Sequence, residues 1–140
     1  MINKDENTIA ILIHDLARQL RVMIDAKVEP YSLTRLKWQT LGILDRKDGI
    51  SQAELAERLD LDRSAVGRLL ERMEKRGFIR RLRDKEDRRI VRVYIEDNVR
   101  PLLDDLEKIS DEVRDQALKN LSDEEEKQLV GLLLKIKSSL

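Results

Sequence analysis

The order of elements between residues 51 and 95 constrains the fold most, because two short amphipathic stretches are followed at once by a basic hairpin. Ser51 with Glu54 three residues later has the pattern of a helix capping box, and Asp62 is placed to cap a second helix. Two β-prone runs then flank a charged tip at 83–89. This order predicts a winged helix-turn-helix, an arrangement that offers its second helix to the DNA major groove and its wing to a neighbouring minor groove.

Further amphipathic helices are predicted on both sides of this unit. Residues 7–27, 98–120 and 122–139 repeat apolar side chains at spacings of three and four. The central unit is too small to cover all three stripes, so we expect a C2 homodimer whose first and last helices interleave. The alternative is a monomer in which these helices fold back on the central unit.

The predicted fold class is therefore mainly α with a small β-hairpin wing. We divide the chain into a helical dimerisation region, residues 1–32 and 97–140, and a DNA-binding winged helix-turn-helix domain, residues 33–96.

The charge distribution favours a nucleic-acid partner although the formal net charge is zero. Residues 63–92 hold twelve lysines and arginines against five acidic residues, so the rest of the chain is correspondingly acidic. Phosphate neutralisation depends on the local basic face, because physiological salt screens interactions between exposed charges beyond roughly 8 Å. The alternative is that these charges only solvate helix surfaces.

The predicted recognition helix, residues 62–76, has one apolar and one cationic face. Arg68 is the side chain we expect to bond guanine, and Gly67 would let the backbone approach the groove at a cost of about 1 kcal/mol of helix stability. An alternative is that Arg68 only pairs with Glu71 on a solvated face. The expected DNA-binding residues of the whole unit are Arg63, Ser64, Gly67, Arg68, Arg72, Arg83, Lys85, Asp87, Arg88 and Arg89.

Within the wing, Asp87 and Arg89 are two residues apart, so in an extended strand both side chains point to the same side. The carboxylate can then orient the guanidinium for a narrow minor groove. The neighbouring basic side chains suit phosphates. The alternative is a surface salt bridge that merely shapes a turn.

On these residues the chain resembles a MarR-type transcriptional regulator, and it is most similar to the SlyA-like branch. The resemblance is carried by residues 15–18, 33–38, 52–56, 74–77 and 87–89. It implies an obligate dimer on pseudo-palindromic operators, with Arg68 near bases and Arg89 in the minor groove. It also implies a cleft between the dimer helices and the DNA-binding lobe that accepts aromatic carboxylates. Residues 90–96 depart from the resemblance, since they lack the Leu-Thr that often closes the wing in this family.

His14, Arg18 and Trp38 are the candidate ligand-binding residues for that cleft. His14 and Arg18 are four residues apart on one helix face, and a guanidinium beside an indole can bind a carboxylate while the indole stacks on its ring. The alternative is that Trp38 belongs to the core and Arg18 pairs with an acid across the dimer.

Other function classes find little support in the sequence. There is no cysteine and only one histidine, and the five glycines are too scattered for a phosphate loop, so we expect neither an enzyme nor a cofactor or metal. Without a long apolar run or a signal-peptide pattern, we expect a cytoplasmic protein.

The sequence therefore predicts a homodimeric, sequence-specific regulator of transcription that binds double-stranded DNA, a repressor released by a small aromatic acid. The alternative is an architectural DNA-binding or protein-interaction winged helix.

Overall fold

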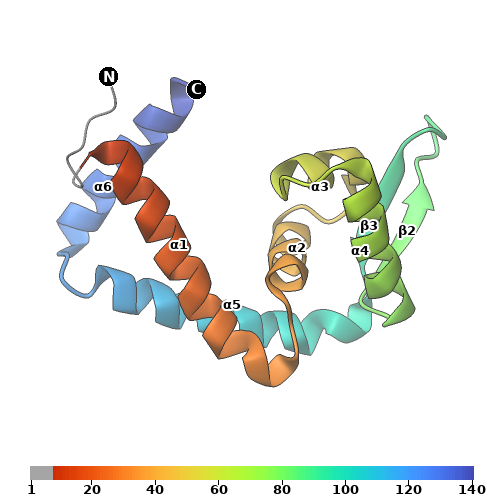
Figure 1. The fold of residues 1–140 in the computed structure, drawn as a ribbon, viewed down its shortest axis with the longest axis horizontal. Coiled ribbons are helices and arrows are strands. Elements are labelled where there is room, and N and C mark those ends of the chain that lie inside the picture. The colour runs from red at the N-terminus through yellow and green to blue at the C-terminus, as the bar shows by residue number, and fades with distance from the viewer. Residues whose placement is uncertain (1–7) are drawn as a thin grey trace.

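The computed structural model describes residues 8–140, and Figure 1 shows its helices and its small sheet. The helices are α1 (Ile9–Val28), α2 (Arg35–Arg46), α3 (Gln52–Arg58), α4 (Arg63–Lys75), α5 (Arg100–Leu118) and α6 (Asp123–Ser138). The strands are β1 (Ile50–Ser51), β2 (Ile79–Arg83) and β3 (Val91–Ile95). Short 3-10 turns at Glu29–Tyr31 and Asp97–Val99 follow α1 and precede α5. The predicted order of helices and hairpin is confirmed, and only residue 7 of the first predicted helix lies outside the described residues.

Side chains cap the starts of α4 and α6, and the cap of α4 is one that the sequence predicts. The Asp62 carboxylate accepts a hydrogen bond from the backbone N–H of Ala65 at 2.7 Å and so caps α4. Ser122 and Glu125 form a complete capping box at the start of α6, with reciprocal bonds of 3.0 and 3.1 Å. These side chains satisfy backbone donors that have no partner within the first helical turn.

The capping box expected at α3 is only half formed. The Ser51 hydroxyl accepts from the Glu54 backbone N–H at 3.1 Å, as predicted. The Glu54 carboxylate binds Lys47 at 2.8 Å and Arg58 at 3.3 Å, and no return bond to the Ser51 backbone forms. Two cations within reach therefore replace the local return bond that the sequence pattern predicted.

The wing belongs to a three-stranded antiparallel sheet with the order β1-β3-β2, whereas the sequence predicted only a hairpin. Strand β1 pairs Ile50 with Val93, and the preceding Gly49 donates its N–H to the Val93 carbonyl at 2.9 Å. Gly49 has a φ of +83°, and an added Cβ would lie 3.0 Å from the Tyr94 ring, so glycine is required there. The sheet thus connects the wing directly to the segment that begins α3.

The hydrophobic core lies between α2, α3, α4 and one face of the sheet. Leu41, Leu44, Leu55, Leu70 and Met73 are fully buried there. The predicted inward face of α4 is confirmed, since all four of its apolar residues, Val66, Leu69, Leu70 and Met73, are buried. Packing against α2 and α3 therefore fixes which side of α4 faces out.

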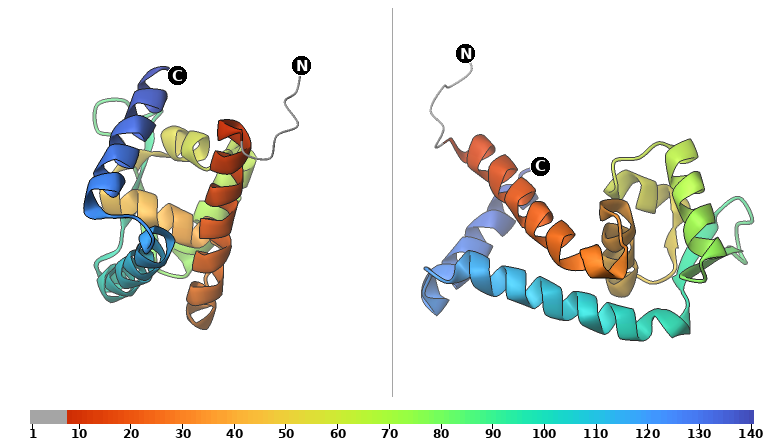
Figure 2. Two further views of the ribbon diagram at one scale, coloured as in Figure 1. Left: turned by 90° about the vertical axis from the view of Figure 1, so that its left-hand side faces the viewer. Right: turned by 60° about the horizontal axis from the view of Figure 1, so that its bottom comes forward.

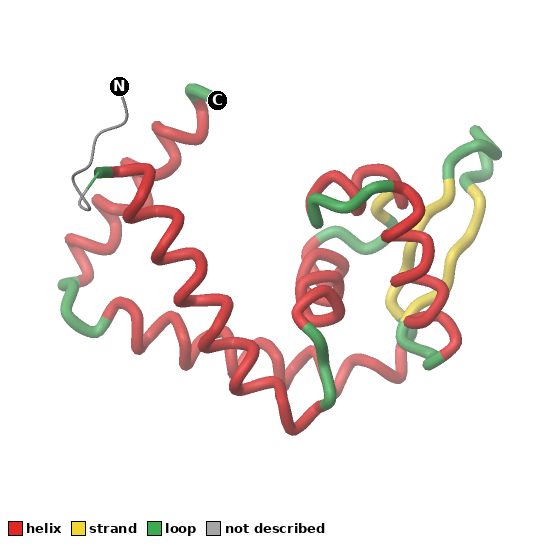
Figure 3. Tube along the Cα trace, viewed as in Figure 1, coloured by secondary structure: helices red, strands yellow, loops and turns green. Residues whose placement is uncertain are grey.

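Helix α5 leaves this winged lobe, which comprises α2 to β3, and runs beneath α1 to the far end of the molecule (Figures 1 and 3). Helix α6 has no buried residue, and the left view of Figure 2 separates it from α1. Within one chain α6 therefore does not fold back on the winged lobe, and the homodimer stays a prediction. No helix between residues 8 and 140 is long and apolar enough to cross a membrane.

Candidate nucleic-acid interface

Helix α4 presents a cationic face opposite its buried face. Arg63, Ser64, Arg68 and Arg72 are all exposed. Within residues 8–140 none of these three arginines has an ion pair shorter than 4 Å, whereas Glu71 pairs with Lys75 at 3.5 Å. The alternative pairing of Arg68 with Glu71 is thus absent, and the guanidinium groups of this face remain available to an anionic partner.

Gly67 lies on the same helix, half-buried against α3. An added Cβ would approach the Gln52 Nε2 atom to 3.9 Å, which is an ordinary contact. Packing inside the chain therefore does not require glycine at this position, and close approach to a DNA groove stays a prediction. Sequence reasoning missed Gln52, whose Oε1 atom is buried without a hydrogen-bond partner in the structure.

At the wing tip, both carboxylate oxygens of Asp87 accept hydrogen bonds from the Arg89 guanidinium. Arg89 Nε and Nη2 each lie 3.0 Å from an Asp87 oxygen, and the guanidinium-bearing side chain is 91% exposed. The Arg89 side chain, and then its backbone N–H, lower the pKa of Asp87 below its usual range. The structure therefore contains an arginine that is exposed and yet oriented.

The expected reason for this pairing was wrong. Residues 84–90 form a turn and not an extended strand. The Asp87 carboxylate accepts from the Arg89 backbone N–H at 3.1 Å, and the Asp87 carbonyl accepts from Ile90 at 3.0 Å. The turn, and not strand alternation, brings the two side chains together.

The other predicted wing residues have different surroundings. Arg83 Nη1 donates to the Arg88 carbonyl at 2.8 Å, so Arg83 closes the loop at its base. Lys85 and Arg88 are exposed, and neither has an ion pair within the described part of the chain. All three cations belong to the wing segment that also carries the Asp87–Arg89 pair.

A second ion pair, which the sequence did not suggest, joins the wing loop to the sheet. Arg92 Nε donates to Asp84 at 2.7 Å, and Arg92 Nη1 donates to the Gly49 carbonyl at 3.0 Å. The other Asp84 oxygen accepts the backbone N–H groups of Glu86 and Asp87 at 3.1 and 2.9 Å. Asp84 and Arg92 are eight residues apart, so only the β2–β3 pairing reveals their contact.

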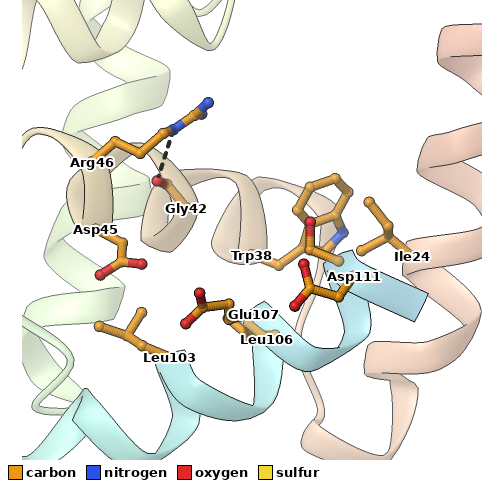
Figure 4. A pocket seen from close by; sticks show the side chains of 10 residues that line it. Ile24, Trp38, Gly42, Asp45, Arg46, Leu103, Leu106, Glu107 and Asp111 are labelled. Carbon is orange, nitrogen blue, oxygen red and sulfur yellow. Dashed lines mark hydrogen bonds between the residues drawn. The ribbon is translucent and has the colours of Figure 1, made fainter. Parts of the chain in front are cut away.

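A cavity of about 320 Å³ lies between α1, α2 and α5 (Figure 4). It is lined by Ile24, Trp38, Gly42, Asp45, Arg46, Leu103, Leu106, Glu107, Ser110 and Asp111. Trp38 is the only one of the three candidate ligand residues in this lining, because His14 and Arg18 are exposed nearer the start of α1. Within one chain, the three candidate residues therefore do not gather around this cavity.

Trp38 also links two helices. Its indole N–H donates to Asp25 on α1 at 2.7 Å, and Arg35 Nε donates to the other Asp25 oxygen at 3.0 Å. Burial would raise the pKa of Asp25, but the hydrogen bonds from Arg35 and Trp38 lower it overall. Trp38 is half-buried at this junction and packs against the hydrophobic core, as the alternative expected.

Comparison with known proteins agrees with this geometry. The family model described as "MarR family" matches residues 33–91, which is nearly the whole winged lobe. A MarR transcriptional regulator from Methanosarcina mazei has a similar structure, with 27% identity, a TM-score of 0.83 and 94% of each chain covered. Staphylococcus aureus MepR is similar in two structures at 28% identity. Its DNA-binding conformation has a TM-score of 0.80 with 94% of this chain and 98% of that chain covered, and its DNA complex has 0.78 with 95% and 98% covered.

The winged lobe is therefore similar to proteins of the MarR family, and one of the similar structures is a protein–DNA complex. The SlyA-like branch stays a prediction. Among residues 8–140, no three histidine or acidic side chains are grouped so that they could hold a metal ion.

Proposed function

We propose that this chain is a MarR-family transcriptional repressor that binds pseudo-palindromic double-stranded DNA as a homodimer. The observation that carries the proposal is the cationic face of α4, free of ion pairs within the described residues, next to an oriented wing arginine. The family match covers the same lobe, and the similar MepR protein is described in complex with DNA. Each part of the surface then has its own role in recognition.

Helix α4 enters the major groove in this proposal. Arg68 lies one turn after Ser64 on the exposed face, and its planar guanidinium matches the O6 and N7 acceptors of guanine. Arg63, in the first turn, suits a phosphate, because contacts from helix starts usually reach the DNA backbone. Arg72, one turn after Arg68, extends the same face toward the opposite groove wall.

The wing reaches the adjacent minor groove. Asp87 already holds the Arg89 guanidinium in one orientation, so little side-chain freedom is lost on binding. A narrow minor groove has an enhanced negative potential, which favours an inserted arginine. Lys85 and Arg88, on the same tip, suit the flanking phosphates.

The second subunit accounts for the apolar surfaces of α1 and α6. Exposed large apolar side chains on these helices include Ile9, Leu12, Leu16, Leu129, Leu132, Leu133 and Leu134. Full burial of one such side chain contributes roughly 1.5–3 kcal/mol, so a second copy that covers both stripes stabilises the pair strongly. Twofold symmetry then places two α4 helices about 34 Å apart, which is one turn of B-form DNA.

An effector in the cavity beside Trp38 would release the operator. The cavity lining contains one cation, Arg46, and three carboxylates, from Asp45, Glu107 and Asp111. Asp45 is paired with Arg100 at 3.3 Å, so Glu107 and Asp111 are the carboxylates that oppose the aromatic acid implied by the resemblance. This charge balance favours an uncharged or cationic aromatic ligand over a carboxylate. Such a ligand shifts DNA occupancy only if it binds the DNA-free and DNA-bound spacings with different affinity.

The ligand class can be tested with three compounds of nearly equal shape. Benzoate, benzamide and benzamidine are titrated against the fluorescence of Trp38, which is the only tryptophan. We expect benzamidine to change the emission at the lowest concentration and benzoate at the highest. The reverse order would restore the carboxylate prediction, and an unchanged spectrum with all three would remove this cavity as the effector site.

The DNA-binding function is tested by selection from a random duplex library followed by sedimentation of the complex. We expect an inverted repeat with half-sites about ten base pairs apart, bound by two subunits. The ratio of specific to nonspecific affinity is the decisive quantity, because all DNA binding weakens with salt. Equal affinity for every duplex would favour the architectural alternative, and a monomer at binding concentration would remove the operator geometry.

A further inference from the structure

A continuous path of contacts connects the base of the winged lobe to the tip of the wing. It begins at the Gly49 carbonyl, which accepts from Arg92 Nη1 at 3.0 Å. Arg92 Nε continues it to Asp84 at 2.7 Å, and Asp84 accepts the backbone N–H of Asp87 at 2.9 Å. The Asp87 carboxylate completes it by holding the Arg89 guanidinium.

Arg92 and Asp84, in the middle of this path, form their contacts within the chain. The Arg92 side chain is 36% exposed and that of Asp84 only 19%, compared with 91% for Arg89. Arg92 donates on two sides, to a carboxylate and to a carbonyl. The hydrogen bond from Arg92, followed by the one from the Asp87 backbone N–H, lowers the pKa of Asp84 below its usual range.

We propose that Asp84 and Arg92 are positioning residues that hold Arg89 in place for the minor groove and do not contact DNA themselves. The inference rests on the proposed DNA-binding function. Asp84 fixes the backbone at residues 86 and 87, and that backbone carries the carboxylate which orients Arg89. Arg92 then anchors Asp84 to the strand that leads into α3. In this proposal, the pair sets the position of the Arg89 guanidinium relative to the sheet.

Asp84→Asn separates positioning from plain electrostatics by the sign of its effect. The change removes a negative charge close to the DNA-facing tip, so electrostatics alone would strengthen binding to phosphate. Loss of the Arg92 contact loosens the tip, so positioning predicts about tenfold weaker operator binding. Fluorescence anisotropy with a labelled operator duplex measures the change, and equal or tighter binding would overturn the proposal.

A double-mutant cycle shows whether Asp84 acts through Arg89. Asp84→Asn is measured in the native background and again in an Arg89→Ala background. We expect the roughly tenfold effect to shrink to less than about twofold once Arg89 is absent, because nothing remains to be positioned. Independent, multiplying effects would overturn the proposal and place Asp84 in a separate structural role.

Arg92→Lys keeps the positive charge but lacks the planar fork that reaches both Asp84 and the Gly49 carbonyl. We expect weaker binding with an unchanged slope of log affinity against log salt, because no phosphate contact is lost. Arg100→Lys in α5, where Arg100 pairs with Asp45 at 3.3 Å outside the wing, is the matched control and should bind normally. If Arg92→Lys binds normally, the planar fork is not needed and the proposal is wrong. A fall in its salt slope would identify Arg92 as a phosphate contact and would also overturn the proposal.

Circular dichroism and sedimentation are measured for every variant to check that the fold and the oligomeric state are unchanged. The outcomes also separate this inference from the proposed function. If the native protein shows no preferred duplex, both the proposed function and this inference are wrong. Suppose instead that the native protein binds its operator and that Arg89→Ala weakens this binding, whereas Asp84→Asn and Arg92→Lys do not. Then only the positioning role is wrong.

Discussion

Replacing Arg89 with alanine is the most direct test of the wing. The guanidinium is exposed and held by two bonds to Asp87, so the change removes no packing and leaves the core intact. Loss of one charge-assisted contact to DNA weakens binding by about tenfold. A dimer carries two wings, so we expect the affinity for a full operator to fall by about 100-fold if the two losses multiply.

The assay is fluorescence anisotropy with labelled operator duplex at fixed ionic strength. A second duplex, in which the A/T flank under the wing is replaced by G/C, should reduce the difference between native and variant protein, because a widened minor groove attracts arginine less. Arg88→Ala is the control for a phosphate contact, and two lost contacts per dimer should lower the salt slope by about 1.8. Native affinity in a folded, dimeric Arg89→Ala protein would refute the wing assignment.

Four further predictions address the recognition helix, the dimer, the core and acid stability. Arg68→Ala should relax base preference at one position in each half-site, and a selection profile identical to that of the native protein would argue against direct readout by this side chain. Leu132, 58% exposed in the single chain, becomes buried in the proposed dimer, so Leu132→Lys should shift sedimentation toward monomer while Glu124→Lys on the same helix does not. Leu70 is fully buried, so Leu70→Ala should lower the free energy of unfolding by about 2–5 kcal/mol in denaturant titration. The pKa of Asp87 is held below its ordinary value of 3.8, so its contribution to wing stability is complete above pH 3.8 and is lost as the pH falls through the lower folded value; an NMR titration of this carboxyl with a midpoint at or above 3.8 would contradict the Arg89 contact.

Regular, local patterns in the sequence predicted most of the fold. The spacing of Val66, Leu69, Leu70 and Met73 fixed the inward side of α4, because helical periodicity is set by the backbone alone. Strand β1 was missed, since two residues carry no periodicity and their pairing with β3 depends on a contact distant in the sequence. The sheet is therefore tied to the start of α3 in a way that only tertiary structure reveals.

In the candidate site too, contacts that are local in the sequence were predicted, and contacts that depend on tertiary structure were not. The Asp87–Arg89 contact is local, so residue types two positions apart sufficed to identify it, although the responsible geometry is a turn. The link from Asp84 to Arg92 needs the register of a hairpin, and no local pattern signals it. The effector residues depended on how α1, α2 and α5 pack, and of the three predicted side chains only Trp38 lines the cavity.

The unbroken helix α5 connects the terminal helices of the chain to its winged lobe. Its 19 residues contain no glycine, and its one proline, Pro101, stands in the first turn, so the helix transmits rotation without bending. At 1.5 Å per residue it is about 28 Å long, and a tilt of about 10° at its far end swings the winged end through roughly 5 Å. A small tilt of α5 against the terminal helices would therefore move the winged lobe by a distance comparable to the width of a minor groove.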